Sequence, residues 1–258
     1  MSEFYIKNNV LRSALLDTAG IVHGFSTRLG GTSALEYTKS MNLAFGRGDK
    51  DEVVIENRRL FAAAVGYDPA RLVTADQIHS DIAVYADGSV SSFPGADALV
   101  TDVPGVAVGV KTADCQPILF SDPEAGIVAA CHAGWRGTVA AIAEKTVCEM
   151  VRRGADRKRI LAALGPCIGK CCFEVKDDFI DAVRAADPSL LRFIDSYHAD
   201  LSGMNEYILA RAGIAPEHVA VCLDCTCCDG GLYYSHRRQR GVRGTMMSVI
   251  CITTGSPV

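Results

Sequence analysis

In the middle of the chain, two short apolar runs lie directly before reactive side chains, and this pattern constrains the fold more than any other. Val106–Val110 precedes Asp114 and Cys115, and Ile127–Cys131 precedes His132. Short runs that are rich in Val and bounded by turn residues predict buried strands. Reactive residues at strand ends, followed by a Gly-rich loop that opens a helix, predict an active site on the edge of a rigid sheet.

The periodicity of the remaining chain predicts further strands and helices. Strands are expected at Phe4–Val10, Ile21–Phe25, Arg71–Ala75, Asp81–Tyr85, Ala96–Thr101, Ile160–Leu164, Val219–Leu223 and Thr245–Ile252. Helices are expected at Asp51–Val65, Thr138–Arg153, Asp177–Ala186 and Met204–Ala212. Strands and helices mix without strict βαβ alternation, which favours a mixed α/β fold over a doubly wound sheet. No linker or charge run divides the 258 residues, so a single domain, residues 1–258, is expected.

The overall charge limits the class of partner. A formal net charge of -4 and a pI of about 5.9 argue against a general nucleic-acid binder, which needs a basic stripe. The basic cluster Arg237, Arg238, Arg240 and Arg243 is local and suits a small anionic ligand instead. No apolar run reaches the roughly 18 residues of a transmembrane helix, and the N-terminus lacks the apolar core of a secretory signal. We therefore expect no membrane partner and a cytoplasmic location.

Two positions, one directly before a predicted helix and one within another, suit an anion. The Gly-Trp-Arg-Gly loop at residues 134–137 precedes the predicted helix Thr138–Arg153, with Thr138 as its N-cap. Free backbone N–H groups and the helix dipole favour phosphate or carboxylate there, and Arg136 adds a positive charge. The loop is not a P-loop, because the Gly-Lys-Ser/Thr ending is missing. In the helix Asp51–Val65, one of the neighbouring Arg58 and Arg59 could point inward to an anion.

Two histidines and one cysteine could bind a single zinc ion. Zinc favours thiolate and imidazole ligands, and catalytic zinc keeps three protein ligands and one open position. His79, Cys115 and His132 would supply this set, although their spacing matches no local zinc motif. Cys115 and His132 follow adjacent predicted strands, so they could meet at one sheet edge. A Cys–His hydrolase pair, in which His132 activates the Cys115 thiol, is the alternative, and a requirement for metal would distinguish the two.

A second metal hypothesis concerns the eleven cysteines, which in a reducing compartment are core residues, metal ligands or catalytic thiols more often than disulfides. Cys225 and Cys228 have CxxC spacing, and with Cys167 and Cys171 they could form a structural all-thiolate zinc site. Cys172 and Cys227 are surplus to that set, and no second CxxC completes it. At this point the role of the segment 222–228 stays open between a metal site and structural packing, and its Cys225-Thr-Cys-Cys228 sequence gives little support to a thioredoxin-like redox role.

Several motifs, in this order along the chain, carry a resemblance to a known family. They are His23-Gly-Phe-Ser-Thr-Arg28, Gln77-x-His79, Ala96-Asp-Ala-Leu-Val-Thr101, Thr112-Ala-Asp-Cys115, His132-Ala-Gly-Trp-Arg-Gly137, Gly165-Pro-x-Ile168, Cys172-Phe-Glu-Val175 and Ser235-x-Arg-Arg238. From about residue 20 to residue 250 the chain resembles the YfiH-type family, once called laccase-domain or multicopper polyphenol oxidase proteins and now purine nucleoside phosphorylases.

The resemblance implies a fold, a metal site and an activity. It implies one α/β domain with a β-sandwich-like core flanked by helices, similar to a toxin-like cysteine hydrolase fold. It implies zinc on His79, Cys115 and His132. It also implies phosphorolysis of adenosine, inosine, guanosine and methylthioadenosine, with deamination of adenosine. Copper and polyphenol (laccase) oxidation are the older alternative, but a multicopper oxidase needs on the order of ten His and Cys ligands. This chain has six histidines and no His-x-His, which favours zinc.

Roles beyond the metal are hypotheses. The expected phosphate- and substrate-binding residues are Ser26, Arg28, Asn42, Arg58, Gln77 and Arg136, and Asp114 or His79 is expected to manage protons. The chain has Ser235-His236-Arg237-Arg238 where many relatives have Ser-Tyr-Arg-Arg, so the part played by the C-terminal arginines is open; His236 is a potential extra ligand that we expect to be exposed. The expected partners are purine nucleosides and phosphate, without nucleic acid, for a monomer or homodimer. A Cys115–His132 hydrolase of cell-wall precursors and a binding protein with a vestigial metal site are the alternatives.

Overall fold

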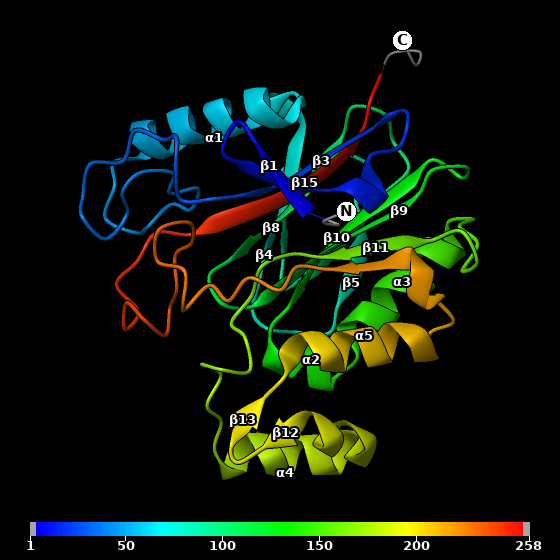
Figure 1. Cartoon of the computed structure of the whole chain (residues 1–258). Coiled ribbons are helices and arrows are strands. Elements are labelled where there is room, and N and C mark those ends of the chain that lie inside the picture. Colours follow the sequence, from blue (N-terminus) through cyan, green and yellow to red (C-terminus); the bar gives the residue numbers. More distant parts are fainter. Residues whose placement is uncertain (1–3, 255–258) are drawn as a thin grey trace.

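Two β-sheets stacked face to face form the centre of the computed structural model, which describes residues 4–254 (Figure 1). The seven-stranded sheet has the order β1 (Phe4–Lys7), β2 (Val10–Ser13), β3 (Ile21–Ser26), β15 (Met246–Ile252), β8 (Ala107–Thr112), β4 (Leu72–Asp76) and β6 (Ser92–Pro94). The six-stranded sheet has the order β14 (Val219–Val221), β11 (Leu161–Leu164), β9 (Gln116–Asp122), β10 (Ile127–Ala133), β7 (Ala98–Thr101) and β5 (Ala83–Tyr85). Both sheets contain parallel and antiparallel pairs.

Helices cover the outer faces of the two sheets (Figure 1). Helix α1 (Asp51–Val65) lies over the seven-stranded sheet, whereas α2 (Trp135–Val139), α3 (Ile142–Arg152) and α5 (Leu201–Arg211) lie on the side of the six-stranded sheet. Helix α4 (Asp177–Ala186) lies farther out on that side, beside the short pair β12 (Ile194–Asp195) and β13 (His198–Ala199). Short 3₁₀ helices span Ala14–Leu16, Pro69–Arg71, Pro188–Phe193 and Pro216–His218.

The side-chain alternation of the central strands explains the layers. In β9, Ile118 and Phe120 pack in the apolar cluster that includes α3, while Leu119 packs between the sheets. In β15, Val249 faces the cluster under α1, and Ile250 faces the other sheet. Successive residues of a strand point to opposite faces, so a strand covered on both sides is apolar at every position. This accounts for the continuous apolar runs that the sequence shows.

The mixed α/β sandwich flanked by helices confirms the expected fold class, and α1 and α4 have the predicted bounds. The prediction of one strand at Phe4–Val10 is wrong. Asn8 and Asn9 both have positive φ, 54° and 61°, and they turn the chain into the hairpin of β1 and β2. A two-residue loop with positive φ at both positions matches the twist of a hairpin, and Asn tolerates this conformation.

Two further corrections concern the centre of the chain. The predicted helix Thr138–Arg153 is broken, because Ala141 has a left-handed φ of 59° between α2 and α3, and Thr138 lies within α2 rather than at an N-cap. The predicted neighbours β8 and β10 belong to different sheets. Strand β9, absent from the prediction, lies between them in the chain and pairs with β10.

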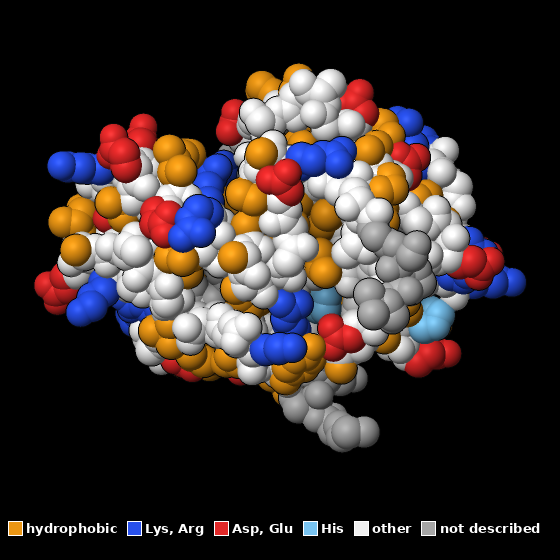
Figure 2. All heavy atoms as spheres, turned by 90° about the horizontal axis from the view of Figure 1, so that it is seen from above, with side chains coloured by type: hydrophobic (Ala, Val, Ile, Leu, Met, Phe, Trp, Pro, Cys, Tyr) orange, Lys and Arg blue, Asp and Glu red, His pale blue; other side chains and the backbone are white. Residues whose placement is uncertain are grey.

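The surface seen over α1 carries basic and acidic side chains interspersed with apolar ones (Figure 2). On α1 itself, Arg59 pairs with Glu56. None of the helices within residues 4–254 combines the length and the apolar character that a membrane crossing requires.

Candidate active site and metal centre

Three loops and strand ends bring His79, Cys115 and His132 together. His79 follows β4, Cys115 lies directly before β9, and His132 lies near the end of β10. The antiparallel pairing of β9 with β10 sets His132 opposite Pro117, two residues from Cys115. One potential ligand atom from each of the three side chains lies within 4.8 Å of the others. The sequence hypothesis that these residues converge therefore holds in the structure, but β9, not β8, carries Cys115 to His132.

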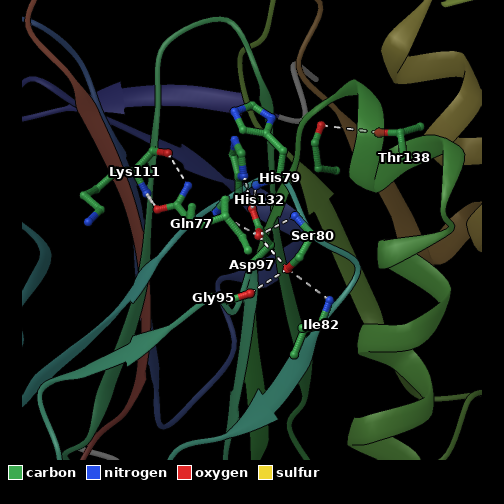
Figure 3. A network of polar contacts seen from close by, with 11 residues as sticks. Gln77, His79, Ser80, Ile82, Gly95, Asp97, Lys111, His132 and Thr138 are labelled. Carbon is green, nitrogen blue, oxygen red and sulfur yellow. Dashed lines mark hydrogen bonds and ion pairs between the residues drawn. The ribbon is translucent and has the colours of Figure 1, made fainter.

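The Asp97 carboxylate, which lies below His132 in Figure 3, holds His132 and the backbone of His79 by hydrogen bonds. Its Oδ1 accepts hydrogen bonds from His132 Nδ1 at 2.6 Å and from the backbone N–H of His79 at 3.2 Å. Its Oδ2 accepts from the backbone N–H and hydroxyl of Ser80, both at 2.7 Å, and from the N–H of Ile78 at 3.2 Å. With Nδ1 of His132 donating to the carboxylate, Nε2 keeps its lone pair for a metal ion.

The electrostatics of the site favour a cation. Burial tends to raise the pKa of Asp97, but the hydrogen bonds from His132 and Ser80 outweigh it and lower this pKa to about 2. Burial tends to lower the pKa of His132, but Cys115 and Asp97 outweigh it and raise this pKa to about 9. Burial and the neighbouring His132 lower the pKa of His79. A metal ion on His132 would replace the proton that its two acidic neighbours attract.

The donor set and the space around it fit zinc. Gly134 lies beside the ligands, and a Cβ at this position would lie 2.5 Å from His79 Nδ1 and 3.2 Å from Cys115 Sγ. A larger residue here would have to displace the His79 ring, so the glycine leaves His79 and Cys115 room to converge. Two imidazole nitrogens and one thiolate are ligands that zinc prefers, and three protein ligands leave one position open. The residues present therefore fit a catalytic type of zinc site.

A cleft with two parts, here called lobes, surrounds the three ligands. The basic lobe, with a volume of about 510 Å³, lies on one side of them. Arg47, Arg58, Lys111 and Arg243 contribute its positive charges. The Arg58 guanidinium donates to the Leu43 carbonyl at 3.0 Å and lies 4.5 Å from the Phe45 ring centroid. Burial lowers the pKa of Lys111 and, together with the nearby Arg47, lowers that of Arg243 to about 10. These crowded cations would be stabilised by a bound anion.

An aromatic lobe of about 320 Å³ lies on the other side and shares His79, Cys115 and Arg243 with the basic lobe. Trp135, Phe173 and Ile168 give it apolar walls, and the exposed His236 lies at its edge, as expected from the sequence. Trp135 is held by an edge-to-face contact with Phe179 at 5.3 Å between centroids. The three ligands thus lie where a charged and an aromatic compartment meet.

Comparisons with known proteins agree with this architecture. The family model described as multi-copper polyphenol oxidoreductase laccase matches residues 22–253. The chain belongs to this family. It is 40% identical over 232 residues to a purine nucleoside phosphorylase of Deinococcus radiodurans, with 89% of this chain and 88% of that protein covered. It is 37% identical over 241 residues to the adenosine deaminase RL5 of an unknown prokaryotic organism, with 86% and 92% covered.

A solved structure shows the same fold in this laccase-type family. The crystal structure of the hypothetical protein YfiH of Bacillus licheniformis matches with a TM-score of 0.91 and 32% identity. The match covers 98% of this chain and 100% of that one. The YfiH-type resemblance drawn from the motifs is therefore confirmed.

The predicted binding residues of this YfiH-type protein fall into two groups. Arg58 and Gln77 line the basic lobe, although the Gln77 amide is bonded to the backbone of Lys111. Ser26, Arg28 and Asn42 do not line either lobe and serve the scaffold. Ser26 Oγ accepts from Met247 N–H, Arg28 donates to the carbonyls of Lys39 and Gly230, and Asn42 bonds to Ala44 and Thr245.

Asp114 and Arg136 lie near the ligands but differ from their expected settings. Asp114 lines the aromatic lobe, and its carboxylate accepts from Thr226 Oγ1, Ser235 Oγ and Arg237 N–H. The exposed Arg136 guanidinium lies 4.1 Å from the Trp135 ring centroid and does not line either lobe. Because α2 spans only Trp135–Val139, the long helix expected after the Gly-Trp-Arg-Gly loop is wrong, whereas the anion site at its start stays a prediction.

Sequence reasoning missed Asp97, Arg47 and Lys111 as site residues, and it placed Arg243 only in a general basic cluster. Asp97 stands in the Ala96–Thr101 motif and is fully buried, so the motif itself carried a signal for it. Arg47, in the loop before α1, and Lys111, on β8, are far apart in the sequence, and they come to the same cleft only in the folded chain.

A second group of possible metal ligands does not line the two lobes. Cys171, Cys172, Cys225 and Cys228 each place Sγ within 4.8 Å of the others. The all-thiolate set considered from the sequence contained Cys167 in place of Cys172, and that choice is wrong. Cys167 is buried, and its Sγ lies 3.3 Å from Ser202 Oγ.

Proposed function

We propose that the protein is a zinc-dependent purine nucleoside phosphorylase that also deaminates adenosine. The observation that carries the proposal is the convergence of His79, Cys115 and His132 at the junction of a basic and an aromatic lobe. A nucleoside and phosphate need these two environments next to each other. Relatives that cover most of the chain are named purine nucleoside phosphorylase and adenosine deaminase, which supports the same assignment.

The aromatic lobe suits the purine, and the basic lobe suits phosphate. Trp135 and Phe173 offer ring faces and edges on which a base can pack. Arg58 and Arg243 supply planar donors, and Arg243 Nε is buried without a hydrogen-bond partner among the described residues. An anion oxygen would satisfy that donor. Arg136, beside Trp135, would add positive charge at the rim rather than a direct ligand.

In phosphorolysis, a phosphate oxygen forms a bond to C1′ of the ribose, while the glycosidic bond breaks and its electron pair goes to the purine. The basic lobe would hold the phosphate in position for this attack. In deamination, water adds at C6 of adenine and ammonia leaves. A zinc ion on His79, Cys115 and His132 would supply Lewis acidity and lower the pKa of a bound water.

The residues around the ligands would hold this arrangement still. Asp97 fixes the Nδ1 proton of His132 and the backbone of His79. Asp114 holds the segments of Thr226 and Arg237 next to Cys115. We therefore assign Asp114 a positioning role, because its oxygens already accept three hydrogen bonds.

Copper-dependent polyphenol oxidation has less support. Of the six histidines, His23 is buried, and its Nε2 accepts from Ser13 N–H at 2.9 Å. Among the described residues, the only cluster of possible ligands that includes histidine contains His79 and His132. A multicopper centre needs several such clusters.

A Cys–His hydrolase is the second candidate, and one contact favours it. Asp97 orients His132, and His132 lies next to Cys115. Cys115, His132 and Asp97 are thus arranged as a nucleophile, a base and a carboxylate that orients the base. Its substrate would be an amide such as that of a cell-wall precursor. Activity that survives complete metal removal would favour this candidate over the zinc enzyme.

The test is an assay of purified, metal-quantified protein on adenosine with and without phosphate, with adenine and inosine measured together. We expect adenine only with phosphate and inosine in both cases. Cys115→Ser should lose both products, whereas Cys148→Ser, a half-buried cysteine on α3, should keep them. If neither purine product forms in the wild-type protein, the proposal fails.

A further inference from the structure

We propose that a second zinc ion, with a structural role, is bound by four cysteines on two distant loops: Cys171, Cys172, Cys225 and Cys228. These cysteines are outside the proposed catalytic site, and the inference does not depend on the nucleoside chemistry. The four Sγ atoms lie within 4.8 Å of one another, and all four cysteines are free thiols. Four thiolates in a compact group are the ligand set of a structural zinc site.

The distances between the sulfur atoms fit one ion at the centre. Zinc–sulfur bonds of about 2.3 Å in a tetrahedron place the sulfur atoms about 3.8 Å apart. Cys172 Sγ lies 3.4 Å and Cys171 Sγ lies 3.6 Å from Cys228 Sγ. A disulfide requires about 2.05 Å, so none of these pairs is bonded. Within 4.8 Å, the group suits a single metal ion rather than a cluster whose sulfur atoms bind separate irons.

The backbone supports the sulfur atoms as it does in metal–thiolate sites. The N–H of Gly169 donates to Cys225 Sγ at 3.2 Å. A Cβ on Gly169 would lie 3.2 Å from Cys225 Cβ and 3.3 Å from Cys171 Sγ, which is tighter than ordinary contact. A glycine here thus lets an amide approach the thiolate, and such hydrogen bonds from outside the ligand shell stabilise bound metal.

Nearby arginines suit the charge of such a site. Zinc with four thiolates carries two negative charges. Arg237 donates to the carbonyls of Cys172 and Glu174, and Arg238 donates to those of Thr226 and Cys227. Both guanidinium groups therefore lie against the backbone of the cysteine loops. Cys171 and Cys228 are exposed, so an ion can enter from solvent, and each thiol releases its proton to water on binding.

The position of the cluster suggests what the ion does. It would join residues 165–175 to residues 222–238, two segments whose cysteines lie 56 residues apart in the chain. From these segments, Phe173 and Arg237 line the aromatic lobe, and Thr226 and Arg237 donate to Asp114. A zinc ion bound here would hold one wall of the aromatic lobe in a fixed position relative to Cys115.

Metal stoichiometry tests the inference. We expect two zinc equivalents per wild-type chain purified with a reducing agent and supplied zinc. Cys225→Ser with Cys228→Ser should lose one equivalent, and His132→Ala should lose only the other. Cys227→Ser is the matched control, because Cys227 lies in the same segment but outside the group of four; it should keep both. In the double variant, amide exchange should rise at residues 165–175 and 222–238.

A spectroscopic measurement guards against variants that fail to fold. Cobalt(II) in the wild-type protein should show the intense thiolate-to-metal charge-transfer bands of four sulfur ligands, in addition to the weaker bands of a site with one. The inference is overturned if the wild-type chain holds a single equivalent that His132→Ala removes, if its cobalt spectrum shows one thiolate only, or if Cys227→Ser loses metal as the double variant does.

Discussion

Replacement of Asp97 by Asn tests how the proposed catalytic metal site is held. The carboxylate is fully buried and accepts five hydrogen bonds. An amide has only one oxygen, so neither orientation satisfies these donors. With NH₂ in place of Oδ2, the N–H groups of Ile78 and Ser80 face another donor. With NH₂ in place of Oδ1, His132 must move its proton to Nε2, which then cannot bind zinc.

The expected magnitude follows from these contacts. Loss of a partner that orients a metal ligand typically costs about 10- to 100-fold in affinity, which corresponds to about 1.4–2.7 kcal/mol. The orphaned donors should lower the free energy of unfolding by about 1–3 kcal/mol. Asp122→Asn is the matched control, because Asp122 is equally buried and accepts from Arg159 and the N–H of Asp156 at the other end of β9. It should lose stability without losing metal affinity.

Zinc affinity is measured by competition with a chelator in the background of Cys225→Ser and Cys228→Ser, so that one metal site remains. Unfolding in denaturant gives the stability of each variant. If Asp97→Asn binds zinc as tightly as Asp122→Asn, the assignment of Asp97 as the residue that orients His132 is refuted.

Three further predictions concern phosphate, pH and the backbone. Arg58→Ala should raise the KM for phosphate about 10- to 100-fold through loss of a charge-assisted hydrogen bond, whereas its exposed neighbour Arg59→Ala should not. Arg136→Ala should raise it less, and an unchanged value would remove Arg136 from phosphate binding. Burial lowers the pKa of the His23 imidazole from 6.5 to about 4. The unfolded chain therefore takes up this proton at a higher pH than the folded chain. The free energy of unfolding should fall by about 3 kcal/mol as the pH is lowered from about 6.5 to 4. His23→Asn should flatten this part of the curve of unfolding free energy against pH, and an equal slope in both proteins would contradict it. Ala141→Gly should stabilise the chain by up to about 1 kcal/mol, because the φ of Ala141 is 59° and glycine adopts this conformation without strain. Ala143→Gly, within α3, should destabilise the chain. If denaturant unfolding shows that both substitutions stabilise or both destabilise the chain, the argument is refuted.

The sequence predicted the layers of the fold better than their connections. Amphipathic and apolar periodicity located α1, α4 and most central strands, because burial on one or two faces dictates it. The sequence patterns did not predict strand β9, because its apolar core, Ile118–Phe120, is short and is flanked by polar residues and Pro117. The break of the helix at Ala141 was not predicted, because nothing in an Ala-rich run indicates a residue with left-handed φ.

The candidate site shows the same limit. Spacing alone made His79 only a weak candidate ligand beside Cys115 and His132, and the family motifs supplied the stronger support for it. Arg28 and Asn42 suited an anion by residue type, but their partners, Gly230 and Thr245, lie more than 200 residues away in the chain, where local patterns carry no information. Asp97 contacts His132 and is not in the group of His79, Cys115 and His132, so a search for ligands passed over it. Tertiary contacts decide whether a polar side chain serves the substrate or the scaffold.

The central claim is that zinc on His79, Cys115 and His132 supports nucleoside chemistry. The most direct measurement is the release of adenine from adenosine and phosphate by metal-stripped protein as zinc is returned. We expect no adenine without metal and a rate that rises with zinc bound to these three residues, with copper failing to replace it. Full phosphorolysis by the stripped protein would contradict the account.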